Sequence, residues 1–427
     1  MALVVKNGRL INPATGEDKI CDIRIDGTKI TAIGTDVDMQ DADILDATGL
    51  VVTPGLIDMH VHLRQPGQSA KETIESGTKA AAAGGFTRVA TMPNTKPVID
   101  SAIIVDGLKY KIADEGVVKV DIIGSLSKGL EGKELSSMGG MAKAGVVAFS
   151  DDGRYVQNCD FMRKAMEYAG MFGKIVIDHC EDADLIEGGH MHEGVVSHEL
   201  GLKGRPAVAE DIAVARDILL AEVTGTAVHI AHISTKNAVQ MVRQAKAKGL
   251  KVTAEATPQH MILTDEALRS YDPRFKVNPP LRSEEHRKAV VEGLVDGTID
   301  AIVTDHAPHT IEEKDCEFSL APSGFVGLET SLGTVLTYLY HAGIVDLMTL
   351  IRAMTSSPAA LLGVDAGNVA VGKAADLTIM DLNKEWTVDS DKFYSKGKST
   401  PFEDMILKGK AVATIVDGKI VMKDGEV

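Results

Sequence analysis

Apolar and polar positions alternate between two patterns through the middle of the chain. Short apolar runs, typical of buried strands, are separated by segments in which apolar residues recur every three or four positions, as in helices. The clearest helical segments span residues 235–248 and 283–295, and the second opens with a serine and two glutamates. The strand-like runs occupy residues 56–62, 86–92, 118–124, 146–150, 174–179, 227–233, 251–256 and 300–305.

Strands that alternate with helices predict parallel βαβ units. Eight such runs favour a closed barrel over an open doubly wound sheet. No G-x-G-x-x-G motif follows the first run and the chain has no P-loop lysine, which argues against the main nucleotide-binding folds. We therefore expect an α/β fold in which residues 53–365 form a (β/α)8 TIM barrel.

The two chain ends share a different pattern, in which apolar residues alternate around Asn-Gly or Asp-Gly. Asn7-Gly8, Asp26-Gly27 and Asp417-Gly418 each predict a hairpin, and residues 375–382 add a further strand. We expect residues 1–52 and 366–427 to form one small composite β-sandwich domain, with the barrel inserted between them.

Composition limits the class of protein. The chain has 427 residues, 44% of them apolar, and a net charge of −16, which argues against nucleic-acid binding. No run approaches the roughly 20 apolar residues of a membrane span, and the N-terminus lacks the features of a signal peptide. The four cysteines lie far apart, which argues against a disulfide framework and suits a reducing cytoplasm.

Residues able to bind metals stand at the C-terminal ends of the strand-like runs, where barrel enzymes place their chemistry. His60 and His62 lie two positions apart, so both can face one metal. Later runs end at His179, His232 and Asp305, and the fourth run leads into Asp151 and Asp152. So many potential ligands at equivalent positions predict a metal hydrolase.

The number of ligands predicts two metal ions. His60, His62 and Asp305 would hold the first ion, and His179 and His232 the second, with an acid from the fourth run as the bridge. Imidazole and carboxylate ligands without thiolate suit zinc, which manganese or cobalt could replace. A water activated by the metals would attack a carbonyl, and Asp305 is the candidate acid/base that carries its proton to the leaving nitrogen.

Seven motifs resemble those of dihydroorotases of the long bacterial type, within the amidohydrolase superfamily. They lie at residues 60–67, 92–95, 149–153, 179–181, 232–235, 278–282 and 304–309, and the resemblance extends over nearly the whole chain. It implies reversible cyclisation of N-carbamoyl-L-aspartate to L-dihydroorotate, the third step of pyrimidine synthesis, in which a hydroxide between two zinc ions attacks the ring amide.

The resemblance also implies individual roles. It selects Asp152 as the bridge and completes a zinc-ligand set of His60, His62, Asp152, His179, His232 and Asp305. It implies that Arg64, Asn94 and His309 hold the substrate carboxylate, while Asn278, His62 and the backbone at Ser323 and Gly324 contact the substrate. Gln65 and Ser323 depart from the family pattern, which usually has Glu and often Phe at these positions.

Two other functions compete with this one. Hydantoinases and allantoinases bridge their metals with a carboxylated lysine on the fourth strand, but residues 146–152 contain no lysine. Some family members have lost their ligands and serve as scaffolds for aspartate transcarbamoylase, but all six ligand positions are filled here. The resemblance suggests a homodimer, with aspartate transcarbamoylase as a further partner.

The remaining histidines receive structural interpretations. His306 competes with His309 for the substrate, and the resemblance favours His309. His229 lies three positions before His232 and is expected to pack on the opposite face of the strand. We interpret as structural or solvated His190, His192, His198, His260, His286 and His341.

The polar segment 310–322 follows the last barrel strand, and we hypothesise that it closes over the substrate.

Overall fold

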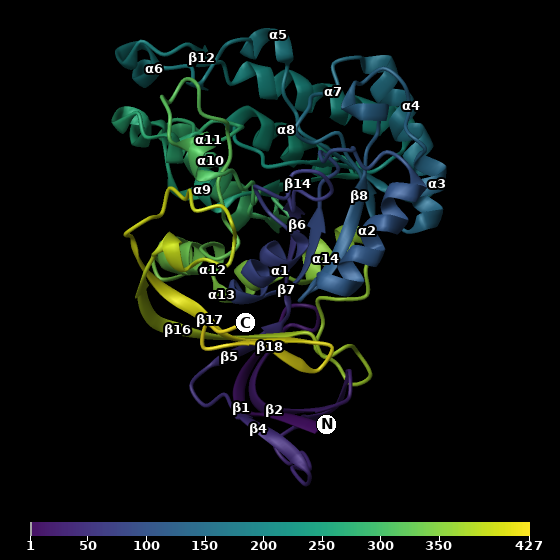
Figure 1. The fold of residues 1–427 in the computed structure, drawn as a ribbon, viewed down its shortest axis with the longest axis vertical. Helices are drawn as coiled ribbons and strands as arrows, with labels where there is room; N and C mark the ends of the chain where they lie inside the picture. The colour runs from purple at the N-terminus through teal and green to yellow at the C-terminus, as the bar shows by residue number, and fades with distance from the viewer. Residues whose placement is uncertain (1) are drawn as a thin grey trace.

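The molecule has two parts, an α/β barrel and a mixed sheet built from both ends of the chain (Figure 1). This computed structural model describes residues 2–427. The purple and yellow strands of the chain ends lie side by side at one end of the barrel. The predicted fold class is therefore confirmed.

The barrel consists of eight parallel strands that pair in the order in which they occur along the chain. Beyond the last of them, Val61 pairs with His306, and the amide of His62 donates to the carbonyl of His306 at 2.8 Å, which closes the ring. All eight predicted runs are confirmed. They are β6 (Leu56–Val61), β7 (Phe86–Thr91), β8 (Lys119–Gly124), β9 (Ala148–Phe149), β10 (Ile175–Asp178), β13 (Val228–Ile230), β14 (Val252–Ala256) and β15 (Ala301–Ile302).

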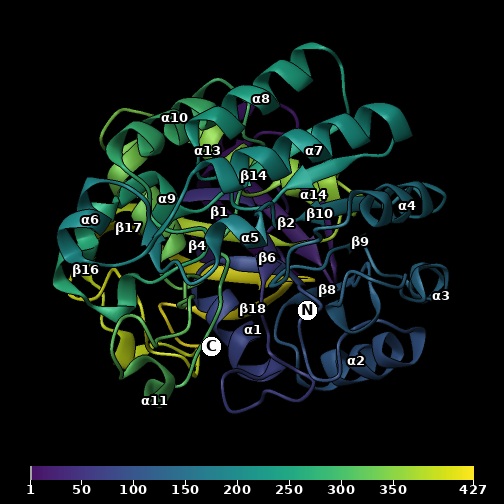
Figure 2. The same ribbon diagram turned by 90° about the horizontal axis from the view of Figure 1, so that it is seen from above.

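Helices surround this ring of strands (Figure 2). Both helices singled out in the sequence are confirmed: α8 begins after Thr235, whose side chain accepts from the amide of Ala238, and α10 begins after Ser283. In the described part of the chain, no helix is both long and apolar enough to span a membrane. The longer helices are α1 (Ile74–Ala83), α2 (Ala102–Glu115), α3 (Met138–Ala144), α4 (Cys159–Gly170), α7 (Val208–Thr224), α8 (Lys236–Ala247), α10 (Glu284–Val295), α13 (Leu347–Ala353) and α14 (Ser356–Leu362).

Shorter elements fill the connections. Between β10 and α7 lie α5 (Ala183–Ile186), β11 (Met191–His192), α6 (Val195–Leu200) and β12 (Gly204–Arg205). Between β14 and α10 lie α9 (Pro258–Ile262), η2 (Asp265–Ser270) and η3 (Pro273–Phe275). The others are η1 (Lys128–Leu130), α11 (Ile311–Lys314), α12 (Ser331–Val335), the π-helical turn η4 (Leu336–Tyr340) and η5 (Ser390–Lys392).

The sheet from the chain ends has the order β18-β17-β16-β5-β1-β2-β3, with β4 parallel to β1. The hairpins predicted at Asp26-Gly27 and Asp417-Gly418 are confirmed, as is the strand predicted at residues 375–382. The strands are β1 (Ala2–Asn12), β2 (Glu17–Asp26), β3 (Lys29–Gly34), β4 (Ala42–Asp46), β5 (Val51–Pro54), β16 (Leu377–Thr387), β17 (Ile406–Val416) and β18 (Lys419–Lys423).

The hairpin predicted at Asn7-Gly8 is wrong, because β1 continues through both residues. Its register against β2 shifts between Val5 and Gly8, and Asn7 has a φ of 58°, so the pair forms a β-bulge. A Cβ on Gly8 would lie 2.4 Å from the Cγ2 atom of Val52, so the close approach of β5 requires glycine. Asn-Gly therefore marks an extra residue in one strand at this position.

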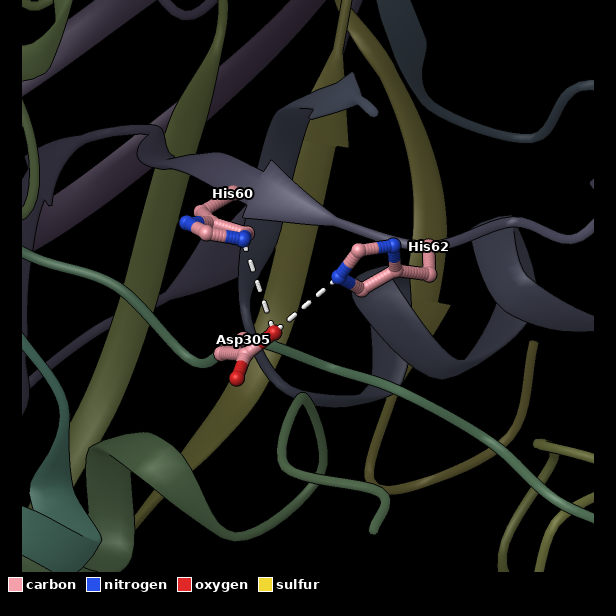
Figure 3. A group of neighbouring side chains, drawn as sticks. All are labelled: His60, His62 and Asp305. Atoms are coloured by element: carbon pink, nitrogen blue, oxygen red, sulfur yellow. Dashed lines mark hydrogen bonds and ion pairs between the residues drawn. The ribbon is translucent and has the colours of Figure 1, made fainter. Parts of the chain in front are cut away.

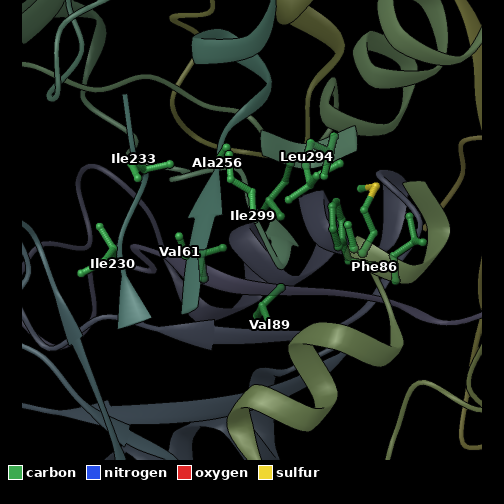
Figure 4. Close-up of a cluster of buried hydrophobic side chains, with 14 of the residues drawn as sticks. Val61, Phe86, Val89, Ile230, Ile233, Ala256, Leu294 and Ile299 are labelled. Atoms are coloured by element: carbon green, nitrogen blue, oxygen red, sulfur yellow. The ribbon is translucent and has the colours of Figure 1, made fainter. Parts of the chain in front are cut away.

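The barrel and the end sheet share a hydrophobic core. One buried cluster includes Val61, Phe86 and Leu294 from the barrel (Figure 4) and extends to Met380 and Ala411 of the end sheet. A second cluster lies within the end sheet, where β1, β2, β16 and β17 contribute Leu3, Val5, Ile23, Ile379 and Ile415. The predicted domain boundaries remain predictions; β5, part of the end sheet, extends past the boundary at residue 52.

Candidate metal centre

Six side chains from five strand ends meet at the C-terminal mouth of the barrel. The Nε2 atom of His62 lies 3.1 Å from Oδ1 of Asp305, and the Nε2 atom of His60 lies 3.5 Å from the same oxygen (Figure 3). The strands thus bring together the predicted ligands, which are His60, His62, Asp152, His179, His232 and Asp305.

The carboxylate of Asp152 lies between two pairs of imidazoles. Its Oδ2 atom is 3.5 Å from Nε2 of His60 and 3.4 Å from Nε2 of His62. Its Oδ1 atom is 3.3 Å from Nδ1 of His179 and 3.6 Å from Nε2 of His232. One oxygen therefore faces each pair, which is the arrangement that a ligand shared by two ions requires.

The neighbouring Asp151 faces away from the cluster. Its Oδ1 atom accepts from the amides of Leu126 at 2.8 Å and Ser127 at 3.0 Å, and its Oδ2 atom accepts from the Ser127 hydroxyl. Burial raises the pKa of Asp151 to about 6. Asp151 thus holds the loop after β8, and only Asp152 faces the imidazoles.

The residues at the mouth fit a metal. The buried Nε2 atom of His60 has no hydrogen-bond partner in the described part of the chain, although an unpaired buried polar atom is costly. Two groups of three buried side chains place ligand atoms within 4.8 Å of one another: His60 with His62 and Asp305, and His60 with Asp152 and His232. Imidazole nitrogens and carboxylate oxygens are a donor set suited to a divalent ion such as zinc.

The electrostatics agree with that fit. Burial opposes charge on His60, but the carboxylates of Asp152 and Glu255 outweigh it and hold the pKa of this imidazole well above its ordinary value. The pKa of His179 rises to about 9, where burial is outweighed by Asp152 and Glu181. The facing imidazoles hold the pKa of Asp152 well below its ordinary value despite burial. The carboxylates thus favour positive charge in this dry site, where a divalent cation could take the place of the imidazole protons.

The cluster forms one wall of a cavity of about 200 Å³. All the predicted substrate-binding residues line it: His62, Arg64, Asn94, Asn278, His309, Ser323 and Gly324. His306 instead points its Nε2 atom toward Oε2 of Glu72, at 3.3 Å, so His309 is the histidine at the cavity. The structure therefore brings the two predicted sets of residues together.

Three residues of this site have positive φ angles, which are uncommon outside glycine. The values are 60° for Arg64, 29° for His232 and 50° for Asp305. β6 ends at Val61, so Arg64 lies on a turn beyond the strand, and this turn places its side chain at the cavity. Such backbone strain concentrates at functional sites.

The two asparagines of the cavity contact predicted metal ligands. The Oδ1 atom of Asn94 lies 2.9 Å from Nδ1 of His62, and the Nδ2 atom of Asn278 lies 3.1 Å from Nε2 of His179. Asn278 also donates to the hydroxyl of Tyr155 at 2.7 Å. Each asparagine therefore fixes the orientation of one predicted metal-binding imidazole through a ring nitrogen.

His309 lies across the cavity from the ligand cluster. Its Nε2 atom donates to the carbonyl of Ser323 at 2.9 Å. Burial, together with the nearby cations Arg64 and Lys71, lowers the pKa of His309 to about 3, so the ring is neutral. Gln65, which departs from the family pattern, accepts from the amide of Ile74 at 2.8 Å and so caps α1 outside the cavity.

Sequence reasoning missed two fully buried acids near the cluster. Asp58 accepts from the amides of His60 and Thr304, each at 3.1 Å, and burial raises its pKa to about 7. Glu255 lies on β14 with its Oε1 atom 2.5 Å from Nδ1 of His60. Both acids could have been noticed in the sequence, because each is an ionisable residue within an otherwise apolar strand-like run. His229 is buried as expected, but its ring is hydrogen-bonded to Glu255 as well as packed.

Comparison with known proteins gives a consistent assignment. A dihydro-orotase-like family model matches residues 49–238, and an amidohydrolase family model matches residues 332–422. The dihydroorotase of Pelotomaculum thermopropionicum is 53% identical over 99% of both chains, and that of Geobacter metallireducens is 51% identical over 99% of this chain and 100% of its own.

Among solved structures, the L-hydantoinase (dihydropyrimidinase) of Arthrobacter aurescens superposes with a TM-score of 0.90 at 28% identity, covering 100% of this chain and 97% of its own. That similarity supports the barrel with its end sheet. The two dihydroorotases, which match over nearly the whole chain, indicate to which family of the superfamily the chain belongs. The chain therefore belongs to the dihydroorotase family of the amidohydrolase superfamily and is a cyclic-amide hydrolase.

Proposed function

We propose that this enzyme interconverts N-carbamoyl-L-aspartate and L-dihydroorotate, the ring-closing step of pyrimidine synthesis. The observation that carries the proposal is the cavity itself, with Asp152 between two pairs of imidazoles on one wall and Arg64 on another. The names of the full-length relatives support the same reaction.

Two zinc ions are the cofactor that we propose. His60, His62 and Asp305 would hold one ion, and His179 and His232 the other, with Asp152 as the shared ligand. Bound there, the ions would act as Lewis acids on the amide carbonyl and lower the pKa of water toward neutrality. Asn94 and Asn278 would keep His62 and His179 in place, as partners of ligating histidines commonly do.

Asp305 is the residue that we propose to move the proton. It takes the proton of the attacking water and delivers it to the ring nitrogen that leaves, and it reverses both transfers during ring closure. Its Oδ1 atom lies 3.1 Å from Nε2 of His62, at the edge of the cavity, so it is close to both the ligand cluster and the substrate space.

Arg64, Asn94 and His309 are the proposed contacts to the substrate carboxylate. Arg64 is 8% exposed, and its Nε atom donates to the carbonyl of Pro308 at 3.1 Å, which fixes the direction of the guanidinium. A buried cation pairs strongly with a carboxylate. Asn278 and the backbone at Ser323 and Gly324 line the rest of the cavity, where the ring would lie.

A hydantoinase activity is the alternative that the structural similarity raises. Residues 146–152 offer Asp152 where hydantoinases use a modified lysine, and Arg64 suits a substrate that bears a carboxylate. Turnover should be measured with dihydroorotate, hydantoin and allantoin, alongside metal content. We expect turnover of dihydroorotate alone, with two zinc ions per chain. Turnover of hydantoin alone would refute the proposal, and a metal-free, inactive protein would favour a scaffold.

A homodimer in the cytoplasm is a further proposal. The outer face of α7 exposes four apolar side chains, Val208, Ile212, Leu219 and Val223, at 46%, 49%, 63% and 71%. Several exposed apolar side chains on one helix face commonly mark a protein–protein surface. We expect sedimentation to give a dimer and Leu219→Lys to give a monomer. The free cysteines suit the cytoplasm, and aspartate transcarbamoylase remains a predicted partner.

A further inference from the structure

Glu255 is a carboxylate inside the barrel that the reaction proposed above does not use. It lies on β14 and is 0% exposed. Its Oε1 atom is 2.5 Å from Nδ1 of His60 and also accepts from the amide of His232 at 3.3 Å. A buried carboxylate is costly without hydrogen-bond partners. Glu255 finds two of its partners in residues predicted to bind metal, which suggests that it acts on them.

The other oxygen of Glu255 begins a chain of hydrogen bonds that leads away from the cluster. Oε2 is 3.1 Å from Nε2 of His229, and Nδ1 of His229 is 2.8 Å from the hydroxyl of Thr253. His60 and His229 are both 0% exposed. Thr253 lines a separate cavity of about 470 Å³ at the N-terminal ends of the strands, so the chain of contacts crosses the barrel interior.

The directions of these bonds are mutually consistent. When the Thr253 hydroxyl donates to Nδ1 of His229, Nε2 of His229 carries a proton and donates to Glu255. Glu255 then accepts a second hydrogen bond, from the N–H at Nδ1 of His60. A neutral imidazole protonated at Nδ1 has its lone pair at Nε2. That Nε2 atom of His60 faces Asp152 and Asp305 and has no hydrogen-bond partner in the described residues.

We propose that Glu255, held by His229 and Thr253, is a positioning residue that fixes the ring and the tautomer of His60 for metal binding. The inference rests on the metal site proposed above. Glu255 also makes the imidazole a stronger donor, because a carboxylate that accepts from one ring nitrogen raises the basicity of the other. His60 belongs to both groups of potential ligands, so its orientation affects both halves of the site.

The test is the zinc affinity of the full-length enzyme, measured by competition with a chelator. Glu255→Gln removes the charge at nearly the same volume and should weaken zinc binding by about 10- to 100-fold. The absorption spectrum of the cobalt-loaded variant should also shift, because the donor strength of His60 changes. Thr253→Val acts from the far end of the chain of contacts and should weaken zinc binding in the same direction, by a smaller factor.

Asp58→Asn is the matched control. Asp58 is also fully buried, but it accepts from the backbone amide of His60 and has no hydrogen bond to the ring in the described part of the chain. We expect this variant to be less stable with an unchanged zinc affinity and cobalt spectrum. Wild-type affinity and spectrum in Glu255→Gln, or in Thr253→Val where Glu255→Gln does not fold, would overturn the positioning role. Absence of zinc binding by the wild-type enzyme would instead overturn the metal site.

Discussion

The ammonium group of Lys314 donates to the carbonyl oxygen of Gly324 at 3.0 Å, where Gly324 forms part of the cavity wall. Lys314 also donates to Pro322 at 3.0 Å, and Lys276 donates to the carbonyls of Phe318 and Ser319 at 2.8 and 2.9 Å. Both lysines are buried, and burial lowers the pKa of each to about 8. Lys314 therefore ties the segment hypothesised to close over the substrate to itself and to Gly324, and Lys276 holds the same segment from outside it.

Removing one of these cations should loosen the cavity wall. Lys314→Met leaves the buried carbonyl of Gly324 and the partly buried carbonyl of Pro322 without this donor, and such a loss costs about 1–3 kcal/mol. We expect KM for dihydroorotate to rise by roughly tenfold, equivalent to about 1.4 kcal/mol, with a smaller change in kcat. Steady-state kinetics measure this, with the exposed Lys133→Met as the control. An unchanged KM would show that the segment keeps its position without Lys314.

Substitutions of the neighbouring residues Asp151 and Asp152 should have different effects, the first on stability and the second on metal binding. Asp152→Asn should lose zinc, because its two oxygens face both pairs of imidazoles. Asp151→Asn should keep zinc but lower the free energy of unfolding by about 1–3 kcal/mol, because the loop after β8 loses an acceptor. Elemental analysis and urea denaturation measure the two effects. Zinc loss in Asp151→Asn would contradict the assignment of the bridge.

The barrel and the meeting of the candidate ligands could be predicted because both depend on local patterns. Apolar runs alternate with helical segments, and parallel strands in a barrel end at one face. His60 and His62, at the end of such a run, therefore had to lie near His179, His232 and Asp305. Their mutual distances confirm this expectation.

Other features depend on contacts that no local pattern encodes. Asn7-Gly8 predicts a turn by itself, but the neighbouring β5 makes it a bulge. Glu255 has significance only because its side chain meets His60, which is 195 positions earlier in the sequence. Arg64 reaches the cavity through a positive φ beyond the end of β6, where strand parity no longer applies.

Arg64 should determine which substrates bind. Arg64→Met removes the cation proposed to pair with the substrate carboxylate, and a hydrogen bond to a charged group contributes about 1.5–3 kcal/mol. We expect KM for dihydroorotate to rise by roughly 10- to 100-fold. Hydrolysis of dihydrouracil, which lacks the carboxylate, should be measured in parallel as a slow reaction that the substitution leaves unchanged. Equal losses for both compounds would mean that Arg64 supports the fold of the cavity and not the carboxylate.

Glu329 should make stability depend on pH. It is partly buried before α12 and accepts from the amides of Tyr394 and Ser395 at 2.8 and 3.3 Å, yet burial, reinforced by Glu72, raises its pKa from 4.5 to about 7. Between these values the folded state binds the extra proton, so its stability falls as pH rises.

Glu329→Gln cannot titrate. The unfolding free energy of this variant relative to wild type should therefore increase by about 3 kcal/mol from pH 4 to pH 8 and stay constant above pH 8. Urea denaturation across this range measures the difference, in which other titrating groups cancel because both proteins contain them. Glu131→Gln, at an exposed site, is the control for the loss of a glutamate as such. A difference that does not change with pH for Glu329→Gln would mean that the folded and unfolded states bind the Glu329 proton equally over this range.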